Sequence, residues 1–251
     1  MYPFQAYVPG DSVIHRLDPR VRFFMVLVFI GVVFYADRWL EQFLLFLFIL
    51  FPILLSSVPL KRFLSGIRSF LFLFLLIFLF HSLLTPGRVL FSWGNLTITY
   101  EGLRRGLLFS LRLFFLLLSA GLFSATTSPL EVTRIFSFLL KPFMRIPWVR
   151  DLPLVLSLSL RFAPLLVEEA QRIRWSQLAR GGKIKGIKGV ISVFYPVLFS
   201  AMRRAEELEL ALKAKGYIPG KGIRLKESPL SSLDYAFILY SILPLGVILL
   251  P

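Results

Sequence analysis

Two triplets, each of a small residue, a cation and a glycine, are the segments of this sequence with the clearest chemical use. They are Ala179-Arg180-Gly181 and Ala214-Lys215-Gly216. A helix ends readily at such a triplet, because glycine adopts a left-handed conformation and a cation complements the partly negative carbonyl end. Both triplets end helical patterns within a strongly basic region, Arg161 to Tyr217. Contact with another protein is therefore the alternative to simple capping.

Motifs for catalysis and metal binding are missing from the sequence. The glycine- and lysine-rich connector Gly181 to Gly189 contains no GxxxxGK[ST] motif and follows no predicted strand, so it is not a P-loop. The chain has no cysteine, which excludes thiolate metal sites and thiol catalysis, and no Ser, His and Asp constellation is apparent. His15 and Asp18 lack the further ligands that a metal centre requires. We therefore predict a protein that is not an enzyme, with no cofactor and no metal site.

The composition is that of a membrane protein. Hydrophobic residues make up 57% of the chain, with 27 phenylalanines, which exceeds the apolar content of a typical soluble domain. The formal net charge of +15 would suggest nucleic-acid binding in a soluble protein. Here the basic excess lies in loops and in the middle region between apolar runs, as expected for a protein in a lipid bilayer. We therefore predict no nucleic-acid partner.

Five apolar stretches have the composition of membrane-crossing helices, so we predict an all-α integral membrane protein with about five spans. The stretches are about Val21 to Tyr35, Leu40 to Val58, Ile67 to Leu84, Arg105 to Ala125 and Ser232 to Leu250. Cations gather before the first stretch, between the second and third, and between the fourth and fifth. The positive-inside rule then places the N-terminus and the basic region in the cytoplasm. Three arginines fall on the outer side against this rule: Arg88, Arg104 and Arg105.

The chain is predicted to have three parts. Residues 1–127 contain four spans, residues 128–227 contain interfacial and cytoplasmic helices, and residues 228–251 contain the last span. In the first part, Asp18 before Pro19 is predicted to cap the first span. Aromatic and β-branched residues on both sides of Gly94-Asn95 predict an external hairpin over residues 89–100.

The middle part is predicted to begin with a helix at Ser128-Pro129. Two amphipathic helices follow, one from near Pro164 to Arg180 and one from about Pro196 to Lys215, with an apolar stripe on the second that includes Leu208 and Leu212. The apolar run Leu152 to Leu160 is too short to cross a membrane alone. It either packs under the spans or joins the helix that follows into one long element broken at Pro164.

Ionisable residues are rare within the predicted spans, and two stand out. They are His81, near the outer end of the third span, and Arg112, in the first turns of the fourth. Burying charge in lipid is costly, so such residues are often functional. The central parts of the spans contain no carboxylate, which a proton-coupled carrier would normally have. We therefore predict that Arg112 has a structural role by snorkelling to the membrane surface, and for His81 we predict either interfacial hydrogen bonding or a proton relay.

The sequence resembles the transmembrane T component of energy-coupling factor transporters from Tyr7 to about Tyr217. The resemblance rests on the first triplet with Arg161-Phe162-Ala163-Pro164 and Glu168 before it, and on the opening segment from Pro9 to Arg20. In that family, two Ala-Arg-Gly signatures end cytoplasmic coupling helices. Ala179, Arg180 and Gly181 match the first signature; Ala214, Lys215 and Gly216 match the second, with lysine in place of the usual arginine.

The resemblance implies partners and a function. The coupling helices of the family dock on two ABC-type ATPase subunits, and a separate small membrane subunit, the S component, binds the substrate. It implies a cell-membrane scaffold that transmits ATPase motion for uptake of a vitamin or a metal ion. Lysine lacks the planar fork of arginine, so the second contact would have a different shape.

A permease that binds its own substrate within the helical bundle is the alternative function. Specific substrate binding by this chain alone would support the permease. Co-purification with two ATPases and a small membrane protein would support the coupling scaffold.

Overall fold

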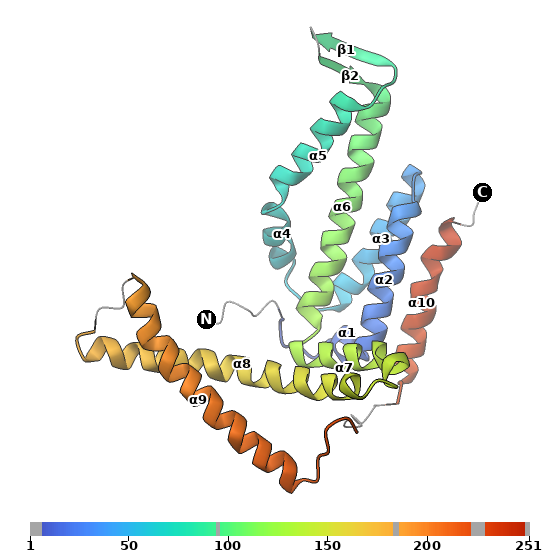
Figure 1. Cartoon of the computed structure of the whole chain (residues 1–251). Coiled ribbons are helices and arrows are strands. Elements are labelled where there is room, and N and C mark those ends of the chain that lie inside the picture. The colour runs from blue at the N-terminus through green and yellow to red at the C-terminus, as the bar shows by residue number, and fades with distance from the viewer. Residues whose placement is uncertain (1–6, 94–95, 183–185, 222–228, 249–251) are drawn as a thin grey trace. The chain divides into compact units, whose positions relative to one another are not determined.

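The computed structural model describes residues 7–93, 96–182, 186–221 and 229–248, and its elements are labelled in Figure 1. The chain forms two compact units, Met1–Ser128 with Ser228–Pro251, and Pro129–Glu227. We call them the membrane unit and the basic unit. Apart from one two-stranded sheet, the regular elements of the described residues are helices, which confirms the predicted all-α class.

The membrane unit contains seven of the described α-helices and the two strands. They are α1 (Val13–Arg16), α2 (Pro19–Tyr35), α3 (Trp39–Leu55), α4 (Leu60–Arg68), α5 (Leu71–Leu84), β1 (Val89–Trp93), β2 (Leu96–Thr99), α6 (Tyr100–Thr126) and α10 (Ser232–Ile248). The strands pair antiparallel, which confirms the hairpin, although its predicted turn residues Gly94 and Asn95 lie outside the described ranges. The third predicted stretch is wrong at its start: α4 ends at Arg68 and α5 begins at Leu71.

One helix of the described residues, α6, is both long and apolar enough to cross a bilayer by itself. It has 27 residues, or about 40 Å at 1.5 Å rise per residue. Three shorter apolar helices, α3, α5 and most of α10, are also present. Every predicted stretch therefore contains a helix, while the number of crossings stays a prediction.

The core of the membrane unit lies where α2, α3 and α6 meet. Its fully buried apolar side chains include Phe29, Val32, Val33, Leu45 and Phe115. Large apolar side chains elsewhere on these helices are exposed, with Phe34 on α2 at 59% and Phe43 on α3 at 62%. An outward-facing apolar surface of this kind is suited to contact with lipid rather than water.

Helix α10 is attached to α3 by aromatic stacking and a hydrogen bond. The rings of Tyr240 and Phe48 stack with centroids 4.2 Å apart, and Phe48 stacks in turn on Phe29 of α2. The Tyr240 hydroxyl donates to the Phe48 carbonyl oxygen at 2.7 Å. Near the start of α10, the Asp234 carboxylate accepts from the backbone N–H of Asp18 at 2.8 Å. Helix α10 thus belongs to the same packed unit as α2, although more than 190 residues separate them.

Removing only the Tyr240 hydroxyl should weaken this attachment measurably. Tyr240→Phe keeps the stacked rings and deletes the hydrogen bond to Phe48, so we expect a loss of about 1 kcal/mol in unfolding free energy. Thermal unfolding of the purified protein in detergent measures it. Tyr235→Phe, on the same helix with Tyr235 62% exposed, is the matched control and should change nothing. Equal melting temperatures for the two variants would contradict the expectation.

The start of α2 is a polar junction. Asp18 caps the helix as predicted, accepting from the Arg20 N–H at 2.9 Å, with Pro19 at the first helical position. Arg22 is 4% exposed, and its Nη1 donates to the carbonyl oxygen of Thr126 and to the Thr127 hydroxyl at the end of α6. Sequence reasoning treated Arg22 only as a cation flanking the first span and missed this contact.

Arg112 of α6 makes two polar contacts with the end of α2. Its Nη2 donates to the carbonyl oxygen of Ala36 at 2.9 Å and forms an ion pair with Asp37 at 2.7 Å. These contacts join α6 to the C-terminal end of α2, where carbonyl groups lack intrahelical partners. The ring of His81 lies 4.5 Å from that of Phe109, and its Nδ1 donates to the Ile77 carbonyl.

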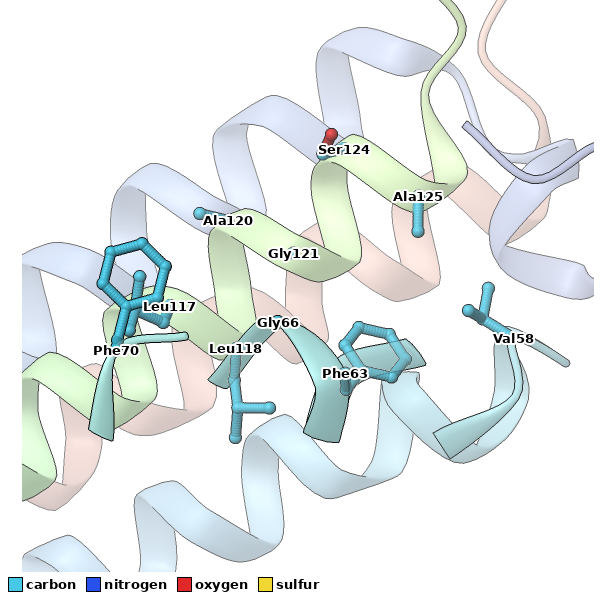
Figure 2. A pocket seen from close by; sticks show the side chains of 10 residues that line it. All are labelled: Val58, Phe63, Gly66, Phe70, Leu117, Leu118, Ala120, Gly121, Ser124 and Ala125. Carbon is cyan, nitrogen blue, oxygen red and sulfur yellow. The ribbon is translucent and has the colours of Figure 1, made fainter. Parts of the chain in front are cut away.

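A cavity of about 330 Å³ opens between α4 and α6 (Figure 2). Large apolar side chains from α4 and its C-terminal flank, Phe63 and Phe70, and from α6, Leu117 and Leu118, line it together with small residues of both helices. Ser124 contributes the one polar side chain among the lining residues. The cavity is therefore suited to apolar groups.

The basic unit consists of α7 (Pro129–Leu139), a short 3-10 helix η1 (Lys141–Phe143), α8 (Pro147–Ala179) and α9 (Gly186–Ala214). The start of α7 at Pro129 is as predicted. The predicted helix start near Pro164 is wrong, because α8 is one continuous helix of 33 residues that contains both Pro153 and Pro164. Of the two alternatives for residues 152–160, joining the helix is confirmed, but the predicted break at Pro164 is not present.

The predicted start of the second basic helix is also wrong. Helix α9 begins at Gly186, ten residues before Pro196, and contains this proline. A proline inside a helix removes one hydrogen bond and strains the preceding turn, but packing against a neighbouring helix can outweigh that cost. Helices α8 and α9 pack on each other, and the buried Gly189 lies in the part of α9 that was predicted as connector.

Candidate functional site

The first triplet ends α8 with a complete C-terminal capping motif. Gly181 has a φ of +79°, and its N–H donates to the Leu178 carbonyl at 3.0 Å. The Gly182 N–H donates to the Gln177 carbonyl at 2.9 Å. This pair of bonds defines the Schellman motif, in which a left-handed glycine reverses the chain and satisfies the last carbonyls. Arg180 is therefore the capping residue itself.

The second triplet ends α9 in the same way. Gly216 has a φ of +73°, and its N–H donates to the Lys213 carbonyl at 2.9 Å. The Tyr217 N–H donates to the Leu212 carbonyl at 3.0 Å. Lys215 thus occupies the position at the end of α9 that Arg180 occupies at the end of α8. The capping role of both triplets is confirmed, and the two cations are presented by one backbone geometry.

Both cations are exposed, and the last turns of both helices also carry exposed apolar side chains. Near Arg180, Leu178 is 40% and Trp175 is 69% exposed. Near Lys215, Leu210 is 68% exposed. Neither cation forms an ion pair within the described part of the chain. A cation beside an exposed apolar surface is typical of a protein contact, whereas capping alone does not require the apolar residues.

The two triplets lie at opposite ends of α9. The first triplet ends α8, a few residues before α9 begins, and the second starts at Ala214, the last of the 29 residues of α9. At 1.5 Å rise per residue, α9 is about 43 Å long. Figure 1 shows α9 beginning near the end of α8, crossing α8 and ending on its other side. One groove on a partner cannot accept both triplets, so this geometry requires two separate contact points.

Ion pairs hold part of α9 in place. Arg204 of α9 pairs with Glu169 of α8 at 3.7 Å, which joins the two helices. In the last turns of α9, Lys213 pairs with Glu209, four positions earlier, at 2.6 Å. The Lys213 ammonium donates a hydrogen bond to the Glu209 carboxylate and lowers the pKa of that carboxyl below its usual value. Lys213 is therefore engaged along its own helix, unlike Lys215.

The chain after the second triplet is attached to the start of α8 through Asp151, which sequence reasoning missed. Its carboxylate accepts from the Gly220 N–H at 2.8 Å and from the Tyr217 hydroxyl. Burial, followed by this contact with Asp151, raises the pKa of Tyr217 to about 12. An isolated carboxylate among the cations that surround residue 151 is the signal that could have drawn attention to it. We call these three residues the Asp151 clasp.

Opening the Asp151 clasp should loosen the second triplet. Asp151→Ala removes both hydrogen bonds, so we expect trypsin to cleave after Lys215 several times faster than in the parent chain, since cleavage follows local opening. Mass spectrometry of a limited digest locates and times this cut. Glu206→Ala removes an exposed carboxylate of α9 and is the matched control. Identical cleavage after Lys215 in both variants would show that the clasp does not hold this segment.

The apolar stripe of α9 is only partly covered. Leu208 and Leu212 are half-buried, whereas Met202 is 54% and Leu198 is 41% exposed. Earlier along the helix, Val190 and Phe194 are also exposed. The N-terminal half of α9 therefore presents an apolar surface that the chain itself leaves open. Within the described ranges, no three His, Asp and Glu side chains gather as metal ligands would.

Comparison with known proteins identifies the family of this chain. The model of the CbiQ family, described as cobalt transport protein, matches residues 10–223. The energy-coupling factor transporter transmembrane protein EcfT of Exiguobacterium sibiricum is 38% identical over 97% of this chain and 95% of its own length. Proteins of the same name from Listeria innocua and Bacillus subtilis are 38% and 37% identical over 86% of this chain and 84% of their own lengths.

The helical membrane unit and these matches place the chain in the class of transmembrane transporter components. Within that class it belongs to the CbiQ family, as an EcfT-like transmembrane component of energy-coupling factor transporters. The resemblance noted in the sequence is thereby confirmed.

Proposed function

We propose that this chain is the scaffold that couples two ABC-type ATPase subunits to a small substrate-binding membrane subunit, in an importer for a vitamin or a metal ion. The observation that carries the proposal is the pair of helix ends with the same cap geometry. Each presents an exposed cation at a Schellman cap, in a last turn that also has exposed apolar side chains, and α9 separates the two. The two contact points are far apart and have the same cap geometry. Such a pair is suited to two partner subunits that resemble each other.

Electrostatics explains why a cation would serve at each point. If Arg180 or Lys215 enters a groove and meets a carboxylate or a row of carbonyls, the contact is a charge-assisted hydrogen bond in a partly dry interface. Because glycine fixes the backbone just beyond, little entropy is lost when the helix end binds. The side chains of Ala179 and Ala214 are too small to obstruct the approach of a partner.

The relatives' names support the role of the partners. They describe energy-coupling factor transporters, and the matched family carries the description cobalt transport protein. A separate substrate-binding subunit is consistent with the apolar lining of the cavity between α4 and α6. ATP hydrolysis then belongs to the ATPase subunits, because this sequence carries no P-loop.

Co-purification tests the proposal. A tagged chain expressed with its chromosomal neighbours should elute from detergent with two ATPase polypeptides and a small third membrane protein. ATP-dependent uptake in vesicles should require all of them. Elution of the tagged chain alone, combined with uptake that needs no ATPase, would overturn the coupling role.

A self-sufficient permease is the second candidate, and the cavity between α4 and α6 is the place to look for its substrate. Its lining is apolar except for Ser124 (Figure 2). A vitamin with charged groups, or a metal ion, requires several convergent polar groups. The cavity therefore favours the coupling scaffold over the permease. Substrate binding by the purified chain alone would reverse that preference.

The orientation is also proposed, with the N-terminus and the basic unit in the cytoplasm. A reporter that is active only in the cytoplasm should give signal when fused after Arg180 and none when fused after Trp93. The reverse pattern would overturn the orientation. Signal at both positions would mean that the spans are miscounted.

A further inference from the structure

The end of the membrane unit that carries the hairpin contains a cluster of arginines that the proposed function does not use. Two cavities of about 490 and 550 Å³ open there and share Asp37, Arg105 and Leu108 in their walls. Arg112 and His81 also line the first cavity, while Arg88 and Arg104 line the second. Three of these four arginines, Arg88, Arg104 and Arg105, lie on the outer side against the positive-inside rule. A ligand that binds them would explain their presence there.

The carboxylates of these cavities do not balance the arginines. Asp37 is engaged by Arg112, and Glu101 accepts from the backbone N–H of Arg88 at 2.6 Å. Arg104 and Arg105 are exposed and form no ion pair within the described ranges. Four arginines thus line two adjacent cavities with two carboxylates, so the linings keep a net positive charge even when both carboxylates are counted.

Two further observations make the cavities suitable for an anion. Helix α6 begins at Tyr100, in the wall of the second cavity, and a helix start attracts negative charge. In the first cavity, Arg112 lines the wall with its side chain 12% exposed, so its charge acts in a partly buried setting, where it attracts an anion more strongly than in water.

We propose that these adjacent cavities bind a phosphate group, with Arg105 at their shared wall as the central ligand. Arginine forms bidentate, charge-assisted bonds with phosphate, and the cavities are large enough for a whole headgroup. The phosphate belongs either to an anionic lipid at the membrane surface or to a soluble molecule. Tyr100, 54% exposed, offers a hydroxyl at the rim.

Native mass spectrometry of the full chain in detergent tests this assignment, with phosphatidylglycerol as the probe and zwitterionic phosphatidylcholine for comparison. We expect preferential retention of phosphatidylglycerol, and about tenfold weaker retention by Arg105→Gln, as for loss of one charge-assisted contact. Arg38→Gln is the matched control, because Arg38 lies at the same end with the same charge but lines neither cavity. It should retain the lipid like the parent chain.

Inorganic phosphate as competitor separates the two sources. Displacement of the lipid by millimolar phosphate supports the site and assigns it to a soluble phosphate. Retention of the lipid against phosphate supports the site and assigns it to a headgroup. Equal retention by the parent chain, Arg105→Gln and Arg38→Gln overturns the proposal. If Arg105→Gln fails to fold, Arg104→Gln takes its place. Retention of phosphatidylglycerol by Arg104→Gln at the level of the parent chain would likewise overturn the proposal.

Discussion

Replacing Arg180 and Lys215 together with alanine is expected to abolish ATPase binding almost completely and, with it, ATP-driven uptake. Each truncation removes a charge-assisted contact and leaves its partner unpaired, a loss of about 2 to 5 kcal/mol where the contact is buried. The two contacts lie at opposite ends of α9, so their losses should be nearly additive. The Schellman hydrogen bonds are made by the backbone, so the basic unit should keep its fold.

ATPase retained on the tagged membrane protein, measured beside uptake in vesicles, checks this expectation. Arg174→Ala is the control, because Arg174 is an exposed cation of α8 outside both triplets.

Lys215→Arg tests the shape of the groove that receives Lys215. Assembly should hold or strengthen if lysine replaces arginine at an arginine-shaped groove, and should weaken if the groove is shaped for lysine. Full retention and full uptake by the double variant would reduce both triplets to helix caps.

Arg22→Ala is expected to give the largest loss of stability in the membrane unit, about 3 kcal/mol of unfolding free energy. The side chain is buried and donates to Thr126 and Thr127, so its removal leaves the end of α6 without these donors. Arg22→Lys should recover part of the loss, because lysine keeps the charge but not the fork. Thermal unfolding in detergent measures the effect.

Arg16→Ala is the control for this change, since Arg16 is exposed at the end of α1. It should leave the melting temperature almost unchanged. If Arg22→Ala lowers the melting temperature as little as Arg16→Ala does, the buried hydrogen bonds of Arg22 do not hold α2 to α6.

Local patterns predicted the helices and the two triplets, because a cap or an apolar stripe involves residues within a few positions of each other. Asp18 before Pro19 and glycine after Arg180 are signals of this local kind. The contacts of Arg22 with Thr126 and of Asp151 with Gly220 join residues 104 and 69 positions apart, and no local pattern encodes them.

The errors at α8 and α9 have a common physical cause. Proline and glycine lower the intrinsic helix propensity, so Pro164 and the segment around Gly189 were expected to end or delay the helices. Packing of α8 against α9 can compensate for this cost, and Gly189 is buried within α9. Tertiary contacts of this kind override propensity, and they are visible only once the fold is known.

Cross-linking at the two helix ends tests the central claim most directly. The chain contains no cysteine, so Arg180→Cys and Lys215→Cys each introduce a unique thiol for a photoactivated maleimide reagent. In native membranes, each position should yield an adduct with an ATPase subunit, while Arg38→Cys should yield none. Absence of ATPase adducts from both helix ends, in complexes that still transport, would contradict the account.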